Sequence, residues 1–134
     1  MAGNAFVHCE LAVEDIGAAK KFYKKLFNWK LDQLGPEMGN YVMVDTGRKM
    51  SGGGMAGKMM ANQPTAWTSY VEVDSVKKTM AKAQKAGAKL LVPFREIGDM
   101  GAIGVFMDPQ GATLGVWELA KKAKKKPAKK KSKK

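Results

Sequence analysis

The chain has 134 residues, the length of one domain, and 45% of them are apolar, which is enough for a globular core. It has no apolar run of about eighteen residues and no basic-then-apolar leader at its start, so we expect a soluble, cytoplasmic protein. The formal net charge of +12 is unevenly distributed. Ten lysines and no acid follow residue 120, so residues 1–120 hold 14 basic and 12 acidic groups, a balance of +2.

A strand pattern that leads into an amphipathic helix occurs twice, sixty residues apart. Residues 8–16 slide onto residues 68–76, so that Val13 recurs as Val73. A second internal similarity, at an offset of sixty-three residues, relates the segment that ends at Gly52 to the segment that ends at Gly115. We interpret the chain as two copies of one unit. A unit this small buries little core alone, so the copies are expected to pack together and leave a polar seam between them.

The first copy is predicted to begin with a strand over residues 6–13. Cys9 in this strand is interpreted as a small buried side chain. Asp15 is expected to cap a helix with a six-residue apolar face. That face comprises Ile16, Ala19, Phe22, Tyr23, Leu26 and Phe27. Further strands are predicted over residues 30–33 and 41–45, and the glycine-rich residues 51–57 fit a closely packed strand better than a phosphate loop.

Residues 58–65 are interpreted as the linker to the second copy. There Ser75 is predicted to cap a helix that ends at Gly87, and a loop is predicted from Glu96 to Met100. Strands are predicted over residues 67–73, 89–93, 103–107 and 112–119, with a tight turn at residues 108–111. Each copy therefore has the order βαβββ, and the predicted class is α+β.

The sequence resembles the glyoxalase/bleomycin-resistance/extradiol-dioxygenase superfamily, also called the vicinal oxygen chelate proteins. The matching words are His8-x-Glu10-Leu11-x-Val13-x-Asp15, Phe22-Tyr23, Leu26-Phe27-x-Trp29, Tyr70-Val71-x-Val73-Asp74 and Phe106-x-Asp108-Pro109-x-Gly111-x-x-Leu114-Gly115-x-Trp117-Glu118. The resemblance implies two tandem βαβββ modules, about 5–57 and 66–119, in a domain over residues 1–120. Their curved sheets would surround a shared cavity, and a homodimer is expected.

Metal-dependent members of this superfamily place a ligand in the first and the last strand of each module. Carried over, the first ligand position is His8, but the others fall on Thr68, Gly115 and a residue at or near Gly52. One imidazole does not hold a divalent ion against water. The sequence thus predicts no metal site and no cofactor. A divalent metal held by His8, with Glu10 on the same strand face as a second ligand, is the alternative.

Strand alternation from His8 defines the residues expected to line the cavity. Those residues are His8, Glu10, Thr68, Tyr70, Glu72, Gly115 and Trp117. An aromatic-walled cavity that holds an imidazole and two carboxylates suits a small, mostly apolar ligand with a few polar or cationic groups. Glu118 is predicted to point away from the cavity into solvent.

Two functions are consistent with such a cavity. The first is a binding protein that holds a small molecule without transforming it. The alternative is a glyoxalase-like lyase or isomerase acting on a small carbonyl compound, with His8 or Glu10 as general base and Tyr70 or the second carboxylate as proton donor. A structural interpretation stands beside the alternative, in which His8, Glu10 and Tyr70 only satisfy one another's hydrogen bonds.

Residues 121–134 are predicted to be a disordered polycationic tail, because they lack apolar periodicity and repel one another. Such a tail binds nucleic acid without reading its sequence, and it would bring the protein to the nucleoid. A solubilising role and attraction to anionic lipid are the alternatives. The lysines concerned are Lys121, Lys122, Lys124, Lys125, Lys126, Lys129, Lys130, Lys131, Lys133 and Lys134.

Overall fold

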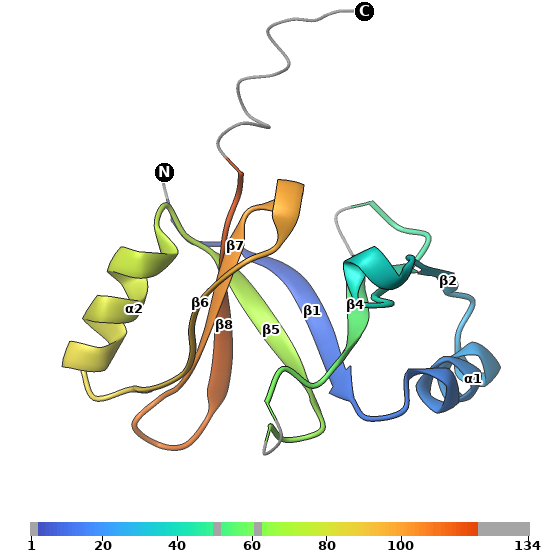
Figure 1. Cartoon of the computed structure of the whole chain (residues 1–134), viewed down its shortest axis with the longest axis horizontal. Helices are drawn as coiled ribbons and strands as arrows, with labels where there is room; N and C mark the ends of the chain where they lie inside the picture. The colour runs from blue at the N-terminus through green and yellow to red at the C-terminus, as the bar shows by residue number, and fades with distance from the viewer. Residues whose placement is uncertain (1–2, 50–51, 61–62, 121–134) are drawn as a thin grey trace, which may run out of the picture. The chain divides into compact units, whose positions relative to one another are not determined.

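The computed structural model describes residues 3–49, 52–60 and 63–120 (Figure 1). Within them the chain forms eight strands, two α-helices and two short 3-10 helices. It divides into two compact units. The N-terminal unit is Val7–Ser69, and the C-terminal unit combines the residues before Val7 with the chain from Tyr70 onward. In the described part of the chain, both helices fall short of the length and apolarity that a membrane crossing requires.

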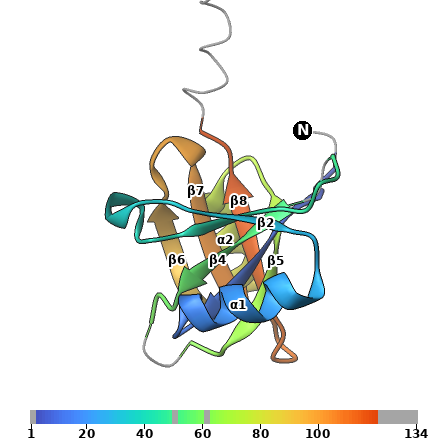
Figure 2. The same cartoon turned by 90° about the vertical axis from the view of Figure 1, so that its right-hand side faces the viewer.

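The N-terminal unit is a helix packed on a small mixed sheet (Figure 2). Its elements are β1 (Phe6–Val13), α1 (Ile16–Leu26), β2 (Lys30–Gln33), a 3-10 helix (Pro36–Met38), β3 (Val42–Asp45) and β4 (Gly52–Gly57). The strands lie in the order β2-β3-β4-β1, with β1 parallel to β4 and the other pairs antiparallel. The buried core is Leu11, Val42, Val44 and Met55.

The C-terminal unit repeats this plan. Its elements are β5 (Ala66–Glu72), which begins in the N-terminal unit, α2 (Val76–Lys85), β6 (Lys89–Glu96), a 3-10 helix (Gly98–Met100), β7 (Ala102–Met107) and β8 (Thr113–Glu118). The order is β5-β8-β7-β6, with β5 parallel to β8 and the other pairs antiparallel. Val73, Val76, Met80 and Val116 form its core.

The predicted α+β class and the βαβββ order of both copies are confirmed. The exact module boundaries, the domain limit at residue 120 and the shared cavity stay predictions. β6 continues through Pro93 to Glu96, beyond its predicted end. This strand lies at the edge of the sheet, where a proline without an N–H group does not interrupt a ladder.

Equivalent glycines occupy the last strand of each module. Glu10 pairs with Gly54 in the β1–β4 register, and Tyr70 pairs with Gly115 in the β5–β8 register. A methyl group on Gly54 would overlap the Tyr41 side chain, and one on Gly115 would overlap the Tyr70 ring. The structural counterpart of Gly115 is therefore Gly54, which agrees with the prediction of a residue at or near Gly52. The offset differs because the connections between the strands differ in length.

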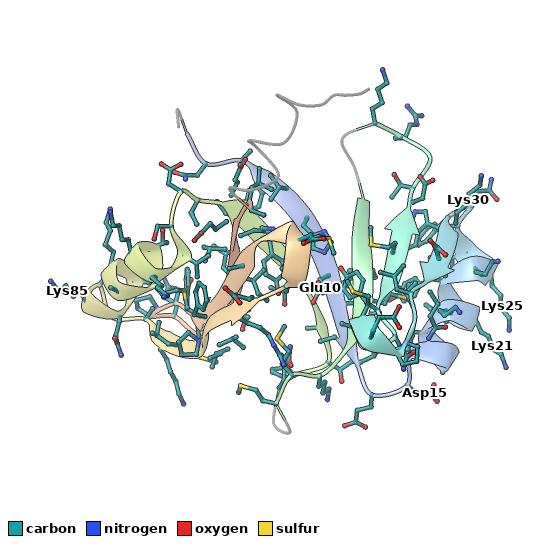
Figure 3. All side chains as sticks on the ribbon, turned by 45° about the horizontal axis from the view of Figure 1, so that its top comes forward. Glu10, Asp15, Lys21, Lys25, Lys30 and Lys85 are labelled. Atoms are coloured by element: carbon teal, nitrogen blue, oxygen red, sulfur yellow. The ribbon has the colours of Figure 1, made fainter. Side chains whose placement is uncertain are left out.

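The predicted apolar face of α1 is only half correct. Ala19 and Tyr23 pack against the core together with Ile16, whereas Phe22 and Leu26 are each 55% exposed and Phe27 is 47% exposed. At about 100° per residue, Phe22 and Leu26 lie on the flank of the helix, and the narrow sheet covers only the central stripe. Lys21 and Lys25 point outward from the same helix (Figure 3).

The turn predicted at residues 108–111 is present. The Asp108 carboxylate accepts hydrogen bonds from the backbone N–H of Ala112 at 3.0 Å and of Gln110 at 2.8 Å. These bonds, that of Ala112 first, lower the pKa of Asp108. Gly111 has a φ of 98°, which glycine adopts without a steric penalty.

The prediction that Glu118 is a solvated charge is wrong, because its side chain is half-buried and hydrogen-bonded, whereas its direction relative to the cavity stays a prediction. Its carboxylate accepts a hydrogen bond of 2.8 Å from the backbone N–H of Val76, the first residue of α2. Ser75 accepts from the N–H of Lys78 at 3.2 Å, so two acceptors satisfy this helix terminus. The last strand of the module therefore holds the start of its helix.

We predict that Glu118→Ala lowers the free energy of unfolding by about 1 kcal/mol, the usual cost of removing a helix cap. Glu118→Gln keeps a side-chain oxygen at the same position and is expected to retain most of the stability. Urea denaturation of both variants and the parent measures the difference. Equal stability of the alanine variant and the parent would show that water replaces this cap without cost.

Candidate functional site

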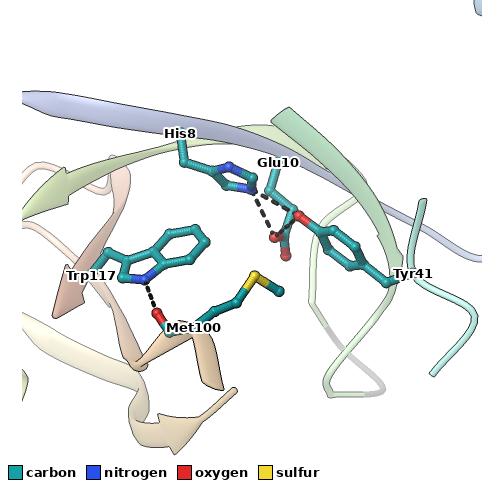
Figure 4. A network of polar contacts seen from close by, with 5 residues as sticks. All are labelled: His8, Glu10, Tyr41, Met100 and Trp117. Carbon is teal, nitrogen blue, oxygen red and sulfur yellow. Dashed lines mark hydrogen bonds and ion pairs between the residues drawn. The ribbon is translucent and has the colours of Figure 1, made fainter. Parts of the chain in front are cut away.

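Three polar side chains meet in the N-terminal unit. His8 Nε2 lies 2.9 Å from the Tyr41 hydroxyl oxygen and 3.3 Å from Glu10 Oε1, and the Tyr41 hydroxyl donates to Glu10 Oε1 at 3.0 Å (Figure 4). The side chains of His8 and Glu10 are 11% and 13% exposed. We call these three residues the polar cluster. Its members are close enough to share protons and remain partly open to solvent.

The strands explain why these residues meet. Alternation along β1 puts His8 and Glu10 on one face of the strand, as predicted. Tyr41 stands directly before β3, after Gly39 and Asn40, which have φ values of 67° and 58° and reverse the chain. Gly54 of β4 lies beside Glu10 and has no side chain, which leaves room for the Tyr41 ring.

The chemistry of the cluster follows from its donors and acceptors. An ionised carboxylate only accepts, so Glu10 accepts from the phenol. The phenol oxygen can then accept an N–H from His8 Nε2, which fixes the orientation of the imidazole. An imidazole oriented in this way can bind a polar group, or take up and return a proton.

Sequence reasoning did not include Tyr41 in the site. A signal was present, because Tyr41 follows a Gly-Asn turn and precedes a strand whose alternate residues Val42 and Val44 are buried. That alternation places Tyr41 on the opposite face from the core. What the sequence lacked was the pairing of β1 with β4, which brings Gly54 beneath the ring.

The other predicted cavity residues form a second group in the C-terminal unit. Tyr70 is 2% exposed, and its ring contacts the Trp117 ring edge-to-face at 5.9 Å between centroids. Trp117 donates from Nε1 to the Met100 carbonyl at 2.8 Å. Register pairs Glu72 with Trp117 and Tyr70 with Gly115. Their use in one ligand site with His8 and Glu10 stays a prediction.

Thr68 and Cys9, two further residues of the N-terminal unit, take no part in the hydrogen bonds among His8, Glu10 and Tyr41. Thr68, predicted to line the cavity, is half-buried on β5. Cys9 is exposed, not buried as predicted, and its Sγ lies 3.7 Å from Ser69 Oγ. Alternation puts Cys9 on the face of β1 opposite His8 and Glu10, the face that carries the core residue Leu11, but Cys9 itself is exposed.

His8 and Glu10 are the side chains that could ligate a metal ion at the polar cluster. In the described residues, no three His, Cys, Asp or Glu side chains come close enough together to hold an ion. His8 and Glu10 offer two donors, and zinc sites in proteins normally use three or four. The residues present therefore do not fit a resident divalent metal, and its absence from the working protein stays a prediction. The predicted polyanion site, residues 121–134, lies outside the described residues.

Known proteins share this sequence pattern and fold. Residues 5–47 match the family model described as bleomycin resistance protein-like N-terminal. The putative glyoxylase CFP32 of Mycobacterium tuberculosis is 31% identical over 116 residues, which cover 81% of this chain and 43% of that protein. The chain thus spans less than half the length of this curated relative.

Two solved structures have the same fold at low sequence identity. Methylmalonyl-CoA epimerase from Mycobacterium tuberculosis has a TM-score of 0.61 and 14% identity, covering 89% of this chain and 90% of that chain. A glyoxalase/bleomycin resistance protein/dioxygenase superfamily member from Vibrio splendidus has a TM-score of 0.55 and 12% identity, covering 87% and 99%. The paired βαβββ modules and these similarities support membership of the glyoxalase/bleomycin-resistance/extradiol-dioxygenase superfamily.

Proposed function

We propose that the chain binds a small organic molecule and that the polar cluster holds a polar group of that ligand. The observation that carries the proposal is the set of mutual hydrogen bonds among His8, Glu10 and Tyr41. Their 11% and 13% exposure leaves His8 and Glu10 within reach of a solute. A fully buried cluster would serve the fold alone.

The donors and acceptors of the cluster select the ligand class. The Glu10 carboxylate can accept a further hydrogen bond from a hydroxyl or a protonated amine, and a protonated imidazole has a second N–H that can donate to a carbonyl oxygen. A ligand with a carbonyl or amino group fits this set. The superfamily supports this class, since the matching family model describes bleomycin resistance and one structural neighbour is an epimerase of a CoA ester. Thr68, Tyr70, Glu72, Gly115 and Trp117 remain the proposed further lining.

We predict that Tyr41→Phe weakens ligand binding about tenfold, because it removes a hydroxyl worth roughly 1.4 kcal/mol in hydrogen bonds. Calorimetric titration with bleomycin and with methylmalonyl-CoA measures the change for whichever probe binds the parent. The matched control is Tyr23→Phe, which loses a hydroxyl that accepts from Trp67 Nε1 at 3.0 Å, outside the cluster. Parent-like affinity of the Tyr41 variant would move the ligand site elsewhere.

A second candidate function is isomerisation of a small carbonyl compound, which the hydrogen-bonded imidazole favours. In this reaction His8 takes the proton from the carbon next to the carbonyl, a proton from water is added to the opposite face of the resulting enolate, and His8 releases its own proton to water, so no group is gained or lost. The Tyr41 hydroxyl and Glu10 would orient the imidazole. A lyase of the glyoxalase type would use the same first step.

We predict, for this second function, that methylmalonyl-CoA in D2O gains deuterium at that carbon in the presence of the protein. Because general bases contribute about 10²–10⁴-fold, His8→Gln should lower the exchange rate by at least about a hundredfold. Glu37→Gln, which changes an exposed acid of the same unit, is the control. If this probe binds saturably but gains no deuterium, the isomerase function is excluded and only the binding function stands.

We further propose that the lysines of residues 121–134 bind polyanions without sequence preference. Ten ammonium groups and no carboxylate in fourteen residues support this role, since each neutralised phosphate releases counterions. Homodimerisation and a cytoplasmic or nucleoid location remain predictions from the resemblance and from this charge.

We predict that deleting residues 121–134 abolishes the retardation of duplex DNA at low salt. The affinity of the parent should fall by at most about 0.9 log units per log unit of salt for each phosphate neutralised. Gel-shift titrations across several salt concentrations measure both effects. Unchanged retardation after the deletion would remove this role from the tail.

A further inference from the structure

The α1 helix carries a row of cationic side chains and no acidic residue, whereas Lys30, at the start of β2, lies opposite Asp45. Residues 16–30 contain five lysines and no aspartate or glutamate. Lys20 donates to Gln33 at 2.9 Å, whereas Lys21, Lys24, Lys25 and Lys30 are exposed. In the part of the chain that the structure describes, none of these four pairs with a carboxylate. Figure 3 shows Lys21, Lys25 and Lys30 pointing outward.

Exposed apolar side chains lie next to this row. Phe22 and Leu26 are four residues apart, as are Lys21 and Lys25, so the helix carries two parallel rows about 100° apart. The ring of Phe22 meets that of Tyr23 edge-to-face at 5.0 Å between centroids, and Tyr23 meets Trp67 in the same way at 5.5 Å. Trp67 is itself 40% exposed.

These rings form an aromatic ladder whose outer members face solvent. The ladder comprises Phe22, Tyr23, Phe27, Trp29 and Trp67, and Phe27 meets Trp29 at 4.8 Å between centroids. Tyr23 and Trp29 pack against the core, which fixes the positions of their exposed neighbours. Rings held in place lose little conformational entropy when a flat partner stacks on them.

The α2 helix shows what a merely solvated basic helix looks like in this protein. It also carries exposed lysines, including Lys78 and Lys82, and it has no acidic residue. Its apolar residues Val76 and Met80 are buried. Lys77 of α2 lies over the ring of the half-buried Phe94, at 4.8 Å from its centroid. What distinguishes α1 is that exposed rings stand beside its lysines.

We propose that α1, the start of β2 and Trp67 form a docking surface for single-stranded nucleic acid. The lysines supply phosphate contacts, and the exposed rings supply platforms for unpaired bases, which is the combination that single-strand binders use. A duplex presents no free base faces, so the exposed rings would add nothing to its binding. Lysines beside Phe, Leu and Trp also mark helices that lie on anionic membranes. In α1, however, Ile16, Ala19 and Tyr23 pack against the core, so only the flank of the helix is left for insertion into a lipid surface.

This inference extends the proposed polyanion role of the tail to a folded element. The test uses a fluorescent oligothymidylate of about 16 nucleotides, the upper size of one single-strand site. Binding is measured by anisotropy over a range of salt concentrations. The proteins are the full chain, Phe22→Ala, the double variant Lys21→Glu/Lys25→Glu, and each of these without residues 121–134. Circular dichroism confirms that each variant is folded.

Two matched variants control for general effects. Phe6→Ala removes a ring that is 73% exposed in the other unit, and Lys78→Glu/Lys82→Glu makes the same charge change on α2. We expect Phe22→Ala to bind at least about fivefold more weakly, since a stacked base contributes roughly 1 kcal/mol or more. The α1 charge reversal should lower the salt slope by about 0.7 for each lost single-strand phosphate contact. Both controls should stay closer to the parent.

The outcomes separate this proposal from that for the tail. If the α1 variants bind like the parent and the tail deletion abolishes binding, the docking surface is overturned and the tail role stands. If the α1 variants weaken binding and the deletion does not, the docking surface stands and the tail role fails. If the full chain binds phosphatidylserine vesicles but binds neither oligothymidylate nor duplex DNA, both nucleic-acid roles fail and the surface is a lipid site.

Discussion

In each module a tyrosine ring lies so close to the last strand that only glycine fits beneath it. Gly54 accommodates Tyr41 and Gly115 accommodates Tyr70, and any side chain at either position would overlap the ring. In both modules the glycine strand runs parallel to the first strand, so the ring is fixed against it. The two tyrosines come from different places, Tyr41 from the turn before β3 and Tyr70 from β5, and the space at Gly54 is what lets Tyr41 reach the polar cluster.

The same arrangement serves different chemistry in the two units. In the N-terminal unit the cleared space holds a phenol that bonds to His8 and Glu10, so the module presents groups that can exchange protons. In the C-terminal unit it holds Tyr70 against Trp117, whose indole N–H is bound by the Met100 carbonyl. Duplication supplied two equivalent positions, and substitution made one polar and one largely aromatic.

Charge is distributed by element in this protein. Lysines occupy the outer faces of both helices, and ten more follow residue 120, whereas Glu10 and Glu118 stand on strands where each accepts a defined hydrogen bond. These two carboxylates thus fix local structure, and the exposed ammonium groups of the helices remain available for outside partners. The polyanion proposals rest on this separation, and the small-molecule proposal rests on the carboxylate of the polar cluster.

The helices and strands, the internal repeat and the superfamily resemblance could be predicted from the sequence alone. Strand alternation, helix caps and glycine turns are local signals, so the sequence carries them directly. Alternation also placed His8 and Glu10 on one face. Tertiary structure alone decided that Tyr41 joins them, that Gly54 rather than Gly52 makes the space, and that Glu118 caps α2. It also left Phe22 and Leu26 exposed. These features depend on which strands pair and how wide a sheet a helix covers, and such contacts between distant residues leave no periodic trace in the chain.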